Sequence, residues 1–163
     1  MKNLHYFIGQ KKSPFHLSVG AVILDKQKKN VYCHHLIKAN GKTDAYLLMR
    51  NTVEPNESLE RALKRGAQKE FGMNVKINRY LGSITGSFVN WEKAKMQKTT
   101  LYFLCEQIGK IKNVKWQESH YGEKSMREWK SIKFLIPQMK KQAKILKRSD
   151  FDESEIIRKV INF

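Results

Sequence analysis

The acidic and basic residues of one short segment, residues 54–73, are spaced in a way that suits chemistry on phosphate groups. The candidate groups are Glu57, Arg65, Lys69 and Glu70. Carboxylates gathered at one edge of a helix are natural ligands for Mg²⁺, because this hard cation prefers oxygen donors in octahedral geometry. A cation held there would neutralise charge on phosphoryl oxygens and help to aim a water at phosphorus.

A capped amphipathic helix over residues 58–71 is predicted to position these groups. Pro55-Asn56 indicates a turn, and Asn56 or Ser58 can accept hydrogen bonds from the free amides at the helix start. Gly72 follows the periodic run, where a left-handed cap favours glycine. Apolar residues at spacings of three and four form the expected inward stripe: Leu59, Ala62, Leu63, Ala67 and Phe71.

One edge of that helix holds Gly66, Lys69 and Glu70, since residues three and four apart are neighbours. With these residues in place, the segment resembles a Nudix box, the strand-loop-helix that holds catalytic magnesium in Nudix hydrolases. The family pattern is Gly, five residues, Glu, seven residues, then Arg-Glu-apolar-any-Glu-Glu-any-Gly-apolar. The positions that match in register are Glu57, Arg65, Ala67, Glu70, Gly72 and Met73. The positions that depart are Asn51 for the glycine, Gly66 for the glutamate after arginine, and Lys69 for the first paired glutamate.

Flanking residues extend the resemblance over roughly residues 15 to 160. Gly20-Ala21-Val22 is similar to the opening strand of the family, Tyr46 and Leu48 to a Trp-any-Leu before the box, and Arg127-Glu128-Trp129 to a late strand. The resemblance implies an α/β fold, a Nudix-type α/β/α sandwich with a mixed sheet. We expect a single domain over residues 15–163 after an N-terminal extension, residues 1–14.

The pattern of apolar residues and turn signals predicts the remaining elements. The expected strands are 17–24, 31–37, 45–49, a bent or bulged 75–89, 99–106 and 126–134. Two later helices are expected. The first begins near Pro137 and ends at residue 146, and the second spans residues 153–161.

The resemblance also implies which groups would hold a metal. Family glutamates at positions 66, 69 and 70 hold most of the Mg²⁺, and only Glu70 is present here. We therefore predict Glu57 and Glu70 as metal ligands and catalytic residues, with Mg²⁺ or Mn²⁺ bound weakly. In the family the arginine matched by Arg65 pairs with the glutamate matched by Glu57. Lys69 is interpreted either as a built-in cation, neutralised by Glu70 or Glu57 and contacting a phosphate, or as a surface salt-bridge partner.

A compensating catalytic base is sought in the loop of residues 117–123. Glu118, His120 and Glu123 lie where some family members keep a general base, which must reach the attacking water. The alternative is an ordinary polar surface loop.

Several basic residues outside the helix are candidate substrate ligands. Lys93, Lys95 and Lys98 follow Trp91 in an expected loop, and basic groups beside an exposed aromatic suit single-stranded nucleic acid. Arg50, together with Arg65 and Lys69, is placed to meet a substrate phosphate. The alternatives are a tryptophan folded back on the sheet and a solvated loop arginine.

The composition agrees with a globular protein that attracts anions. Lys and Arg number 32 against 15 Asp and Glu, a formal net charge of +17. Such a field favours nucleotides or RNA, although a lysine-rich composition alone would produce the same number. Cys33 and Cys105 are expected as free thiols in a reducing compartment. The sequence starts without a signal-peptide pattern and has no membrane-length apolar run, which predicts a cytoplasmic protein with no membrane partner.

Three functions remain open at this point. The first is a Nudix-like domain with a degraded metal site that binds nucleotide or RNA phosphates with weak or no hydrolysis. The second is an active metal-dependent pyrophosphohydrolase that cleaves nucleoside diphosphate-linked substrates. The third is a structural subunit of a ribonucleoprotein assembly that keeps only the fold.

Overall fold

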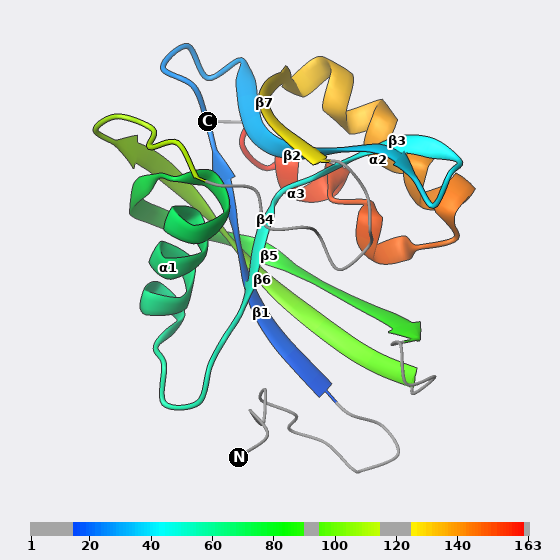
Figure 1. The fold of residues 1–163 in the computed structure, drawn as a ribbon, viewed down its shortest axis with the longest axis horizontal. Coiled ribbons are helices and arrows are strands. Elements are labelled where there is room, and N and C mark those ends of the chain that lie inside the picture. The colour runs from blue at the N-terminus through cyan, green and yellow to red at the C-terminus, as the bar shows by residue number, and fades with distance from the viewer. Residues whose placement is uncertain (1–14, 90–94, 115–124, 162–163) are drawn as a thin grey trace.

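The computed structural model describes residues 15–89, 95–114 and 125–161 (Figure 1). The elements of these residues are β1 (Phe15–Ile23), β2 (Asn30–Ala39), β3 (Thr43–Leu47), β4 (Met49–Thr52), α1 (Leu59–Phe71), β5 (Asn74–Val89), β6 (Lys95–Ile108), β7 (Ser125–Ser131), α2 (Ile132–Leu146), the 3-10 turn η1 (Ser149–Phe151) and α3 (Ser154–Arg158).

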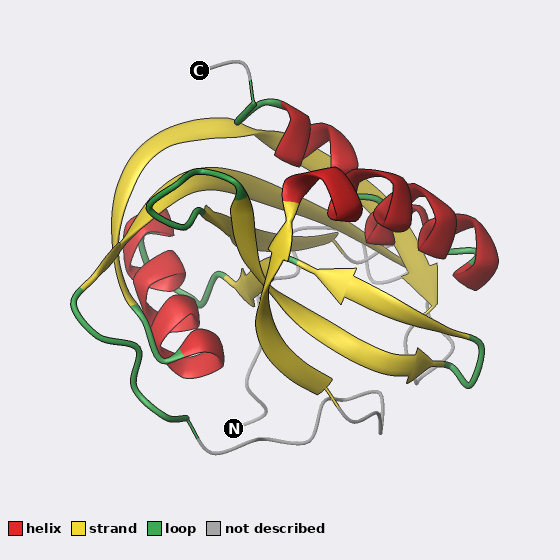
Figure 2. Cartoon of the chain, turned by 90° about the horizontal axis from the view of Figure 1, so that it is seen from above, coloured by secondary structure: helices red, strands yellow, loops and turns green. Residues whose placement is uncertain are grey.

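The described strands form two sheets. The larger sheet has the order β4-β1-β6-β5 and is mixed, because β1 and β6 run parallel while the other neighbours are antiparallel. The smaller sheet is antiparallel, in the order β3-β2-β7. Helix α1 lies on one side of the larger sheet, and α2 and α3 lie on the other side (Figures 1 and 2). The predicted α/β sandwich with a mixed sheet is therefore confirmed.

The apolar stripe of α1 explains its place against the larger sheet. Ala62, Leu63, Ala67 and Phe71 are fully buried and pack in one cluster with residues of β1 and β4. The Ser58 hydroxyl accepts from the Arg61 N–H at 3.2 Å, which confirms the predicted cap. Leu59 was expected in the stripe but is 36% exposed, because it lies at the first helical position, beyond the reach of the sheet.

The bent strand predicted over residues 75–89 is confirmed as β5. Its pairing with β6 shifts register between Ile77 and Arg79 and again between Tyr80 and Gly82. Gly82 has φ of +145°, a conformation that L side chains rarely adopt. The two shifts let one long strand curve around the sheet.

Two element boundaries differ from the sequence prediction. Residues 95–98 were expected in a loop, yet β6 begins at Lys95 and pairs with the end of β5. The strand expected to reach residue 134 ends at Ser131, whose hydroxyl accepts from the Phe134 N–H at 3.2 Å and so starts α2. The sequence predicts a helix start near Pro137, but this residue lies inside α2, where it removes one backbone donor near the exposed Lys133.

Both cysteines are buried and free, as the sequence predicted. Burial raises the pKa of the Cys33 and Cys105 thiols to about 12. No helix in the described part of the chain is long and apolar enough to cross a membrane.

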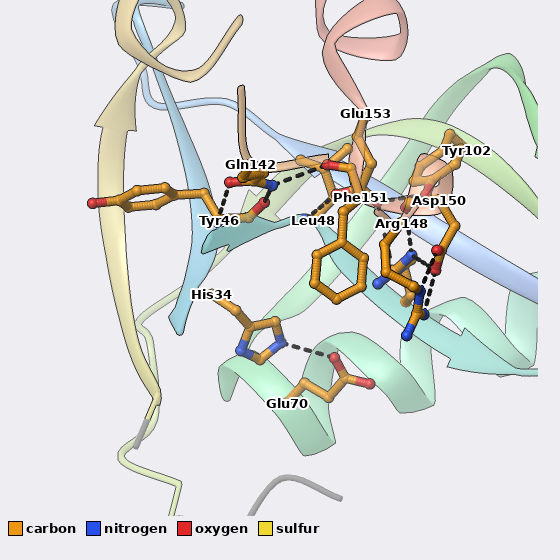
Figure 3. A network of polar contacts seen from close by, with 11 residues as sticks. His34, Tyr46, Leu48, Glu70, Tyr102, Gln142, Arg148, Asp150, Phe151 and Glu153 are labelled. Atoms are coloured by element: carbon orange, nitrogen blue, oxygen red, sulfur yellow. Dashed lines mark hydrogen bonds and ion pairs between the residues drawn. The ribbon is translucent and has the colours of Figure 1, made fainter. Parts of the chain in front are cut away.

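Gln142 joins α2 to the smaller sheet and to η1 (Figure 3). Its amide oxygen accepts from the Tyr46 N–H at 2.8 Å, and its amide nitrogen donates to the Tyr46 carbonyl at 2.7 Å and the Phe151 carbonyl at 2.9 Å. The side chain has no exposed surface, so water cannot replace these bonds.

Gln142→Leu is expected to lower the free energy of unfolding by about 2 kcal/mol or more, because three buried backbone groups would lose their partner. Urea unfolding followed by circular dichroism measures this change. Lys141→Met, an exposed change in the same helix, is the control and should shift stability by less than about 0.5 kcal/mol. Equal stability of the two variants would contradict the role given to Gln142.

Candidate functional site

Glu57, at the start of the box helix, is bound to Arg65. The guanidinium donates from Nε to Glu57 Oε1 and from Nη2 to Glu57 Oε2, both at 2.8 Å. Arg65 Nη2 also donates to the Thr52 carbonyl at 2.8 Å, which ties the helix to the end of β4. The hydrogen bonds from Arg65 are the main reason that the pKa of Glu57 lies below its ordinary value. The pairing implied by the family resemblance is therefore present, and it occupies both carboxylate oxygens.

Glu70 also has a partner, which the sequence reasoning did not assign to it. His34 Nε2 lies 3.0 Å from Glu70 Oε2, and both side chains are about a fifth exposed, 18% for His34 and 24% for Glu70 (Figure 3). The His34 ring packs on Phe71 with centroids 4.7 Å apart. His35 contacts Asp44 and Glu128 instead, as expected for adjacent strand residues that face opposite sides.

Lys69 lies apart from both carboxylates. Its side chain is exposed, and within the described ranges it forms no ion pair with Glu57 or Glu70. The built-in cation hypothesised at this position is thus not neutralised in the way that the sequence suggested, because Arg65 and His34 hold those two groups.

Gly66 and Asn51 lie so close together that a side chain at position 66 would clash with Asn51. A Cβ atom added at Gly66 would lie 2.5 Å from Asn51 Cβ and 2.9 Å from the Met49 sulfur. Asn51 fills that space and donates from Nδ2 to the Ala62 carbonyl at 2.8 Å. The family pattern has glycine at position 51 and glutamate at position 66, so the two departures noted in the sequence are one reciprocal exchange of size. The sequence itself carries a signal for this contact. At position 51 the chain has a larger residue than the family's glycine, and at position 66 it has glycine in place of the family's glutamate.

The residues present do not fit a divalent cation held in the family manner. Of the three positions where the family pattern has metal-binding glutamates, position 66 is a glycine whose side-chain space Asn51 fills, position 69 is a lysine, and Glu70 is paired with His34. Across the part of the chain that the structure describes, no group of three or more His, Cys, Asp or Glu side chains converges to hold a metal ion. An octahedral cation needs more oxygen donors than Glu70 supplies.

The sequence predicts Arg50 as a ligand of a substrate phosphate or, alternatively, as a solvated loop arginine, and the structure corrects the loop alternative. Arg50 lies on β4 with 11% of its side chain exposed. Its Nη1 donates to the Asp150 carbonyl at 3.0 Å, and its Nε lies 3.7 Å from Glu153 Oε1. Of the other predicted substrate ligands, Lys95 is exposed on β6. Trp91, Lys93, Glu118, His120 and Glu123 lie outside the described residues.

Comparison with known proteins assigns the family. The family model described as NUDIX domain matches residues 14–148. The chain belongs to the Nudix family. No curated protein matches it.

Solved Nudix structures share this fold at low sequence identity. A NUDIX hydrolase from Nitrosomonas europaea superposes with a TM-score of 0.58 at 16% identity, covering 90% of this chain and 86% of its own. A MutT protein from Methanosarcina mazei Go1 gives 0.54 at 16% identity, covering 94% and 97%. A MutT NUDIX hydrolase from Burkholderia pseudomallei gives 0.50 at 15% identity, covering 73% and 84%. At such identities the likeness describes the fold.

Glu57→Gln is expected to lower the free energy of unfolding by about 1–2 kcal/mol at neutral pH, because a bidentate ion pair becomes a neutral contact. Because the folded-state pKa of Glu57 is lowered, its contribution is full above the unfolded pKa of about 4.3 and is lost as the pH falls through the folded value. Urea unfolding at several pH values should therefore show the two proteins converging in acid. A difference that stays constant with pH would contradict this role.

Gly66→Ala is expected to destabilise the domain by about 1–3 kcal/mol, because the new Cβ would overlap Asn51. Asn51→Gly should restore part of that loss in the double variant. A double-mutant cycle by urea unfolding measures the coupling. Additive effects of the two changes would show that residues 51 and 66 do not constrain each other.

Proposed function

We propose that this Nudix domain binds nucleotide or RNA phosphates and hydrolyses them weakly or not at all. The observation that carries the proposal is the state of the three box carboxylate positions. Position 66 is a glycine whose side-chain space Asn51 fills, position 69 is a lysine, and Glu70 is paired with His34. The retained helix and its caps keep the geometry of the box without its set of metal ligands.

The charge of the chain supports a polyanionic ligand. A formal net charge of +17 attracts phosphate-rich molecules and accelerates their association. The predicted ligands Arg65 and Lys69 lie on the box helix, and the predicted ligand Lys95 is the first residue of β6. The predicted ligands Trp91 and Lys93 lie outside the described residues. The cytoplasmic location stays a prediction that suits such partners.

Metal-dependent hydrolysis of a nucleoside diphosphate-linked substrate is the second candidate. The observation in its favour is that Glu70 keeps 24% of its side chain exposed at the helix edge. Two solved relatives carry the name hydrolase. A base from Glu118, His120 or Glu123 would be needed, with Mg²⁺ or Mn²⁺ held by Glu70.

Two measurements on the wild-type protein separate these candidates. Titration calorimetry with Mn²⁺ and with Mg²⁺ should give no tight, stoichiometric site, because the oxygen donors are engaged. A panel of nucleoside diphosphate derivatives, incubated with either metal, should release little product. Tight metal binding together with product release would establish the hydrolase instead.

The triple variant Asn51→Gly, Gly66→Glu, Lys69→Glu is the matched positive control for that panel. It should gain Mn²⁺ binding and raise product release, because it restores oxygen donors and the space for them. Gly66→Glu with Lys69→Glu alone should unfold more readily, since Asn51 still occupies the space. If the triple variant folds and gains neither metal binding nor activity, box carboxylates are not what limits hydrolysis.

RNA binding is tested by its salt dependence. The affinity for a single-stranded RNA should fall steeply as salt is added, because phosphate contacts release counterions. An absence of binding to both nucleotides and RNA would leave the structural subunit of a ribonucleoprotein assembly as the remaining candidate.

A further inference from the structure

The exposed side of α2 carries charge of one sign only. Residues 132–148 contain no Asp or Glu. One side of the helix is buried in two apolar clusters with residues of the smaller sheet and of α3 (Figure 2). The other side presents Lys133, Lys141 and Lys144, all exposed, which together are called the lysine stripe. With 3.6 residues per turn, the three lysines lie within about 80° of one another around the helix.

The carboxylates at the borders of the lysine stripe have other partners. On one side, Glu155 pairs with Lys140 at 3.1 Å and with Arg158 at 3.3 Å. On the other side, Asp44 lies 2.9 Å from His35. In the described part of the chain, none of the three stripe lysines makes an ion pair. Their ammonium groups are therefore available to an external anion.

This arrangement differs from that of an ordinary solvated helix face, which mixes both signs of charge. Helix α1 has such a face, where Glu60 and Lys64 pair at 2.6 Å. In α2, Lys141 and Lys144 are three residues apart, and like charges at that spacing destabilise a helix by about 0.2–0.5 kcal/mol. Lys133 lies in the first turn, where the helix dipole favours an acidic residue. The helix thus carries basic residues at some cost to its own stability.

An exposed aromatic ring borders the lysine stripe. Phe134 is 42% exposed and lies seven residues before Lys141, on the same side of the helix. The Phe134 ring meets Tyr46 edge-on with centroids 5.2 Å apart, and Lys130 Nζ lies 5.7 Å from its centroid. An exposed ring among ammonium groups suits an unpaired base, because stacking adds about 1–3 kcal/mol per base while the lysines contact the phosphates.

The length and composition of this side of α2 favour a nucleic acid strand over a membrane. Lys133 and Lys144 are about 16 Å apart along the helix, a length that several phosphates of a flexible strand can follow. A helix that lies on a membrane buries an apolar face in the bilayer. The apolar face of α2 is buried in the domain instead, and its exposed apolar residues, Phe134 and Ile145, lie at one border of the stripe.

We propose that the lysine stripe and Phe134 form a binding surface for single-stranded RNA. The proposal rests on the proposed function and deepens it, because it selects RNA among the phosphate ligands and names the residues that contact it. Helices α1 and α2 lie on opposite sides of the larger sheet (Figure 1). RNA held on α2 therefore does not depend on the carboxylates of the box helix.

Fluorescence anisotropy of a labelled oligouridylate, measured over a series of salt concentrations, tests the proposal. The triple variant Lys133→Gln, Lys141→Gln, Lys144→Gln should bind at least about tenfold more weakly than wild type at low salt, because three phosphate contacts are lost. Its plot of log affinity against log salt should be less steep by about 2, since each phosphate contact of a single strand contributes roughly 0.7. The variant should unfold at or above the wild-type temperature, because like charges are removed.

The matched control is the triple variant Lys26→Gln, Lys76→Gln, Lys110→Gln. These three lysines are exposed and lie outside α2, and the control loses the same net charge. Its affinity should stay within about threefold of wild type with the same salt dependence, because only the long-range field changes.

A second pair of variants tests the stacking contact. Phe134→Leu keeps an apolar side chain against Tyr46 and should weaken RNA binding at least about fivefold, with the salt dependence unchanged, since stacking releases no counterions. Phe134→Tyr keeps the ring and should bind within about twofold of wild type. Equal affinity of Phe134→Leu and wild type would contradict the stacking contact.

The outcomes separate this surface from the proposed function. If wild type binds RNA and the stripe variant keeps its affinity and salt dependence, the surface is wrong while RNA binding stands. If wild type binds nucleotides but no RNA, the surface is overturned and the nucleotide part of the proposed function stands. Binding to phosphatidylserine vesicles that requires the stripe, without binding to RNA, would assign the surface to a membrane instead. If wild type binds neither nucleotides nor RNA, both proposals are overturned.

Discussion

The buried carboxyl of Glu153 is the contact on which the arrangement of the domain depends. It accepts from the Leu48 N–H, at the junction of β3 and β4 where the chain passes between sheets, and from the Tyr102 hydroxyl in the centre of the larger sheet. One side chain from the C-terminal segment thus joins both sheets. Because the group is fully buried, any of these polar groups left without its hydrogen bond would cost more free energy than a new apolar contact would gain. The position of Arg148, Asp150 and Phe151 follows from that anchor.

The box helix keeps the contacts that hold its scaffold, although several residues at its edge differ from the family pattern. Arg65 still clamps Glu57 and the end of β4, so the loop and helix keep their geometry. This clamp stabilises the fold and does not require a cation. Around it, Asn51 has taken the space opposite Gly66, and His34 has joined Glu70. The helix edge is therefore in register with the family pattern, while Gly66 and Lys69 stand at two positions where that pattern has glutamate.

Sequence reasoning reached the fold because its signals were local. The stripe and caps of α1, the turn after residue 39 and the bent strand that became β5 all depend on neighbours in the chain. The beginning of α2 differs from the prediction because Pro137 indicates a helix start, whereas the cap is the Ser131 hydroxyl, which accepts from the Phe134 N–H. The start of β6 was missed because its lysines suggested a loop, although they lie on a strand that pairs along its full length.

The candidate site was harder to foresee, because its contacts join residues far apart in sequence. Nothing local to His34 indicates Glu70, and nothing local to Arg50 indicates the segment after α2. The difference from the family pattern at positions 51 and 66 can be found in the sequence, but its meaning is clear only when the two positions are considered together.

The two buried cysteines have a practical consequence. Their thiols stay protonated across the range in which maleimides and iodoacetamide react, since the reactive species is the thiolate. These are the only cysteines in the sequence. A single cysteine introduced on the surface would therefore take up a fluorophore or a spin label selectively, without removal of either native thiol and without disturbance of the packing around them.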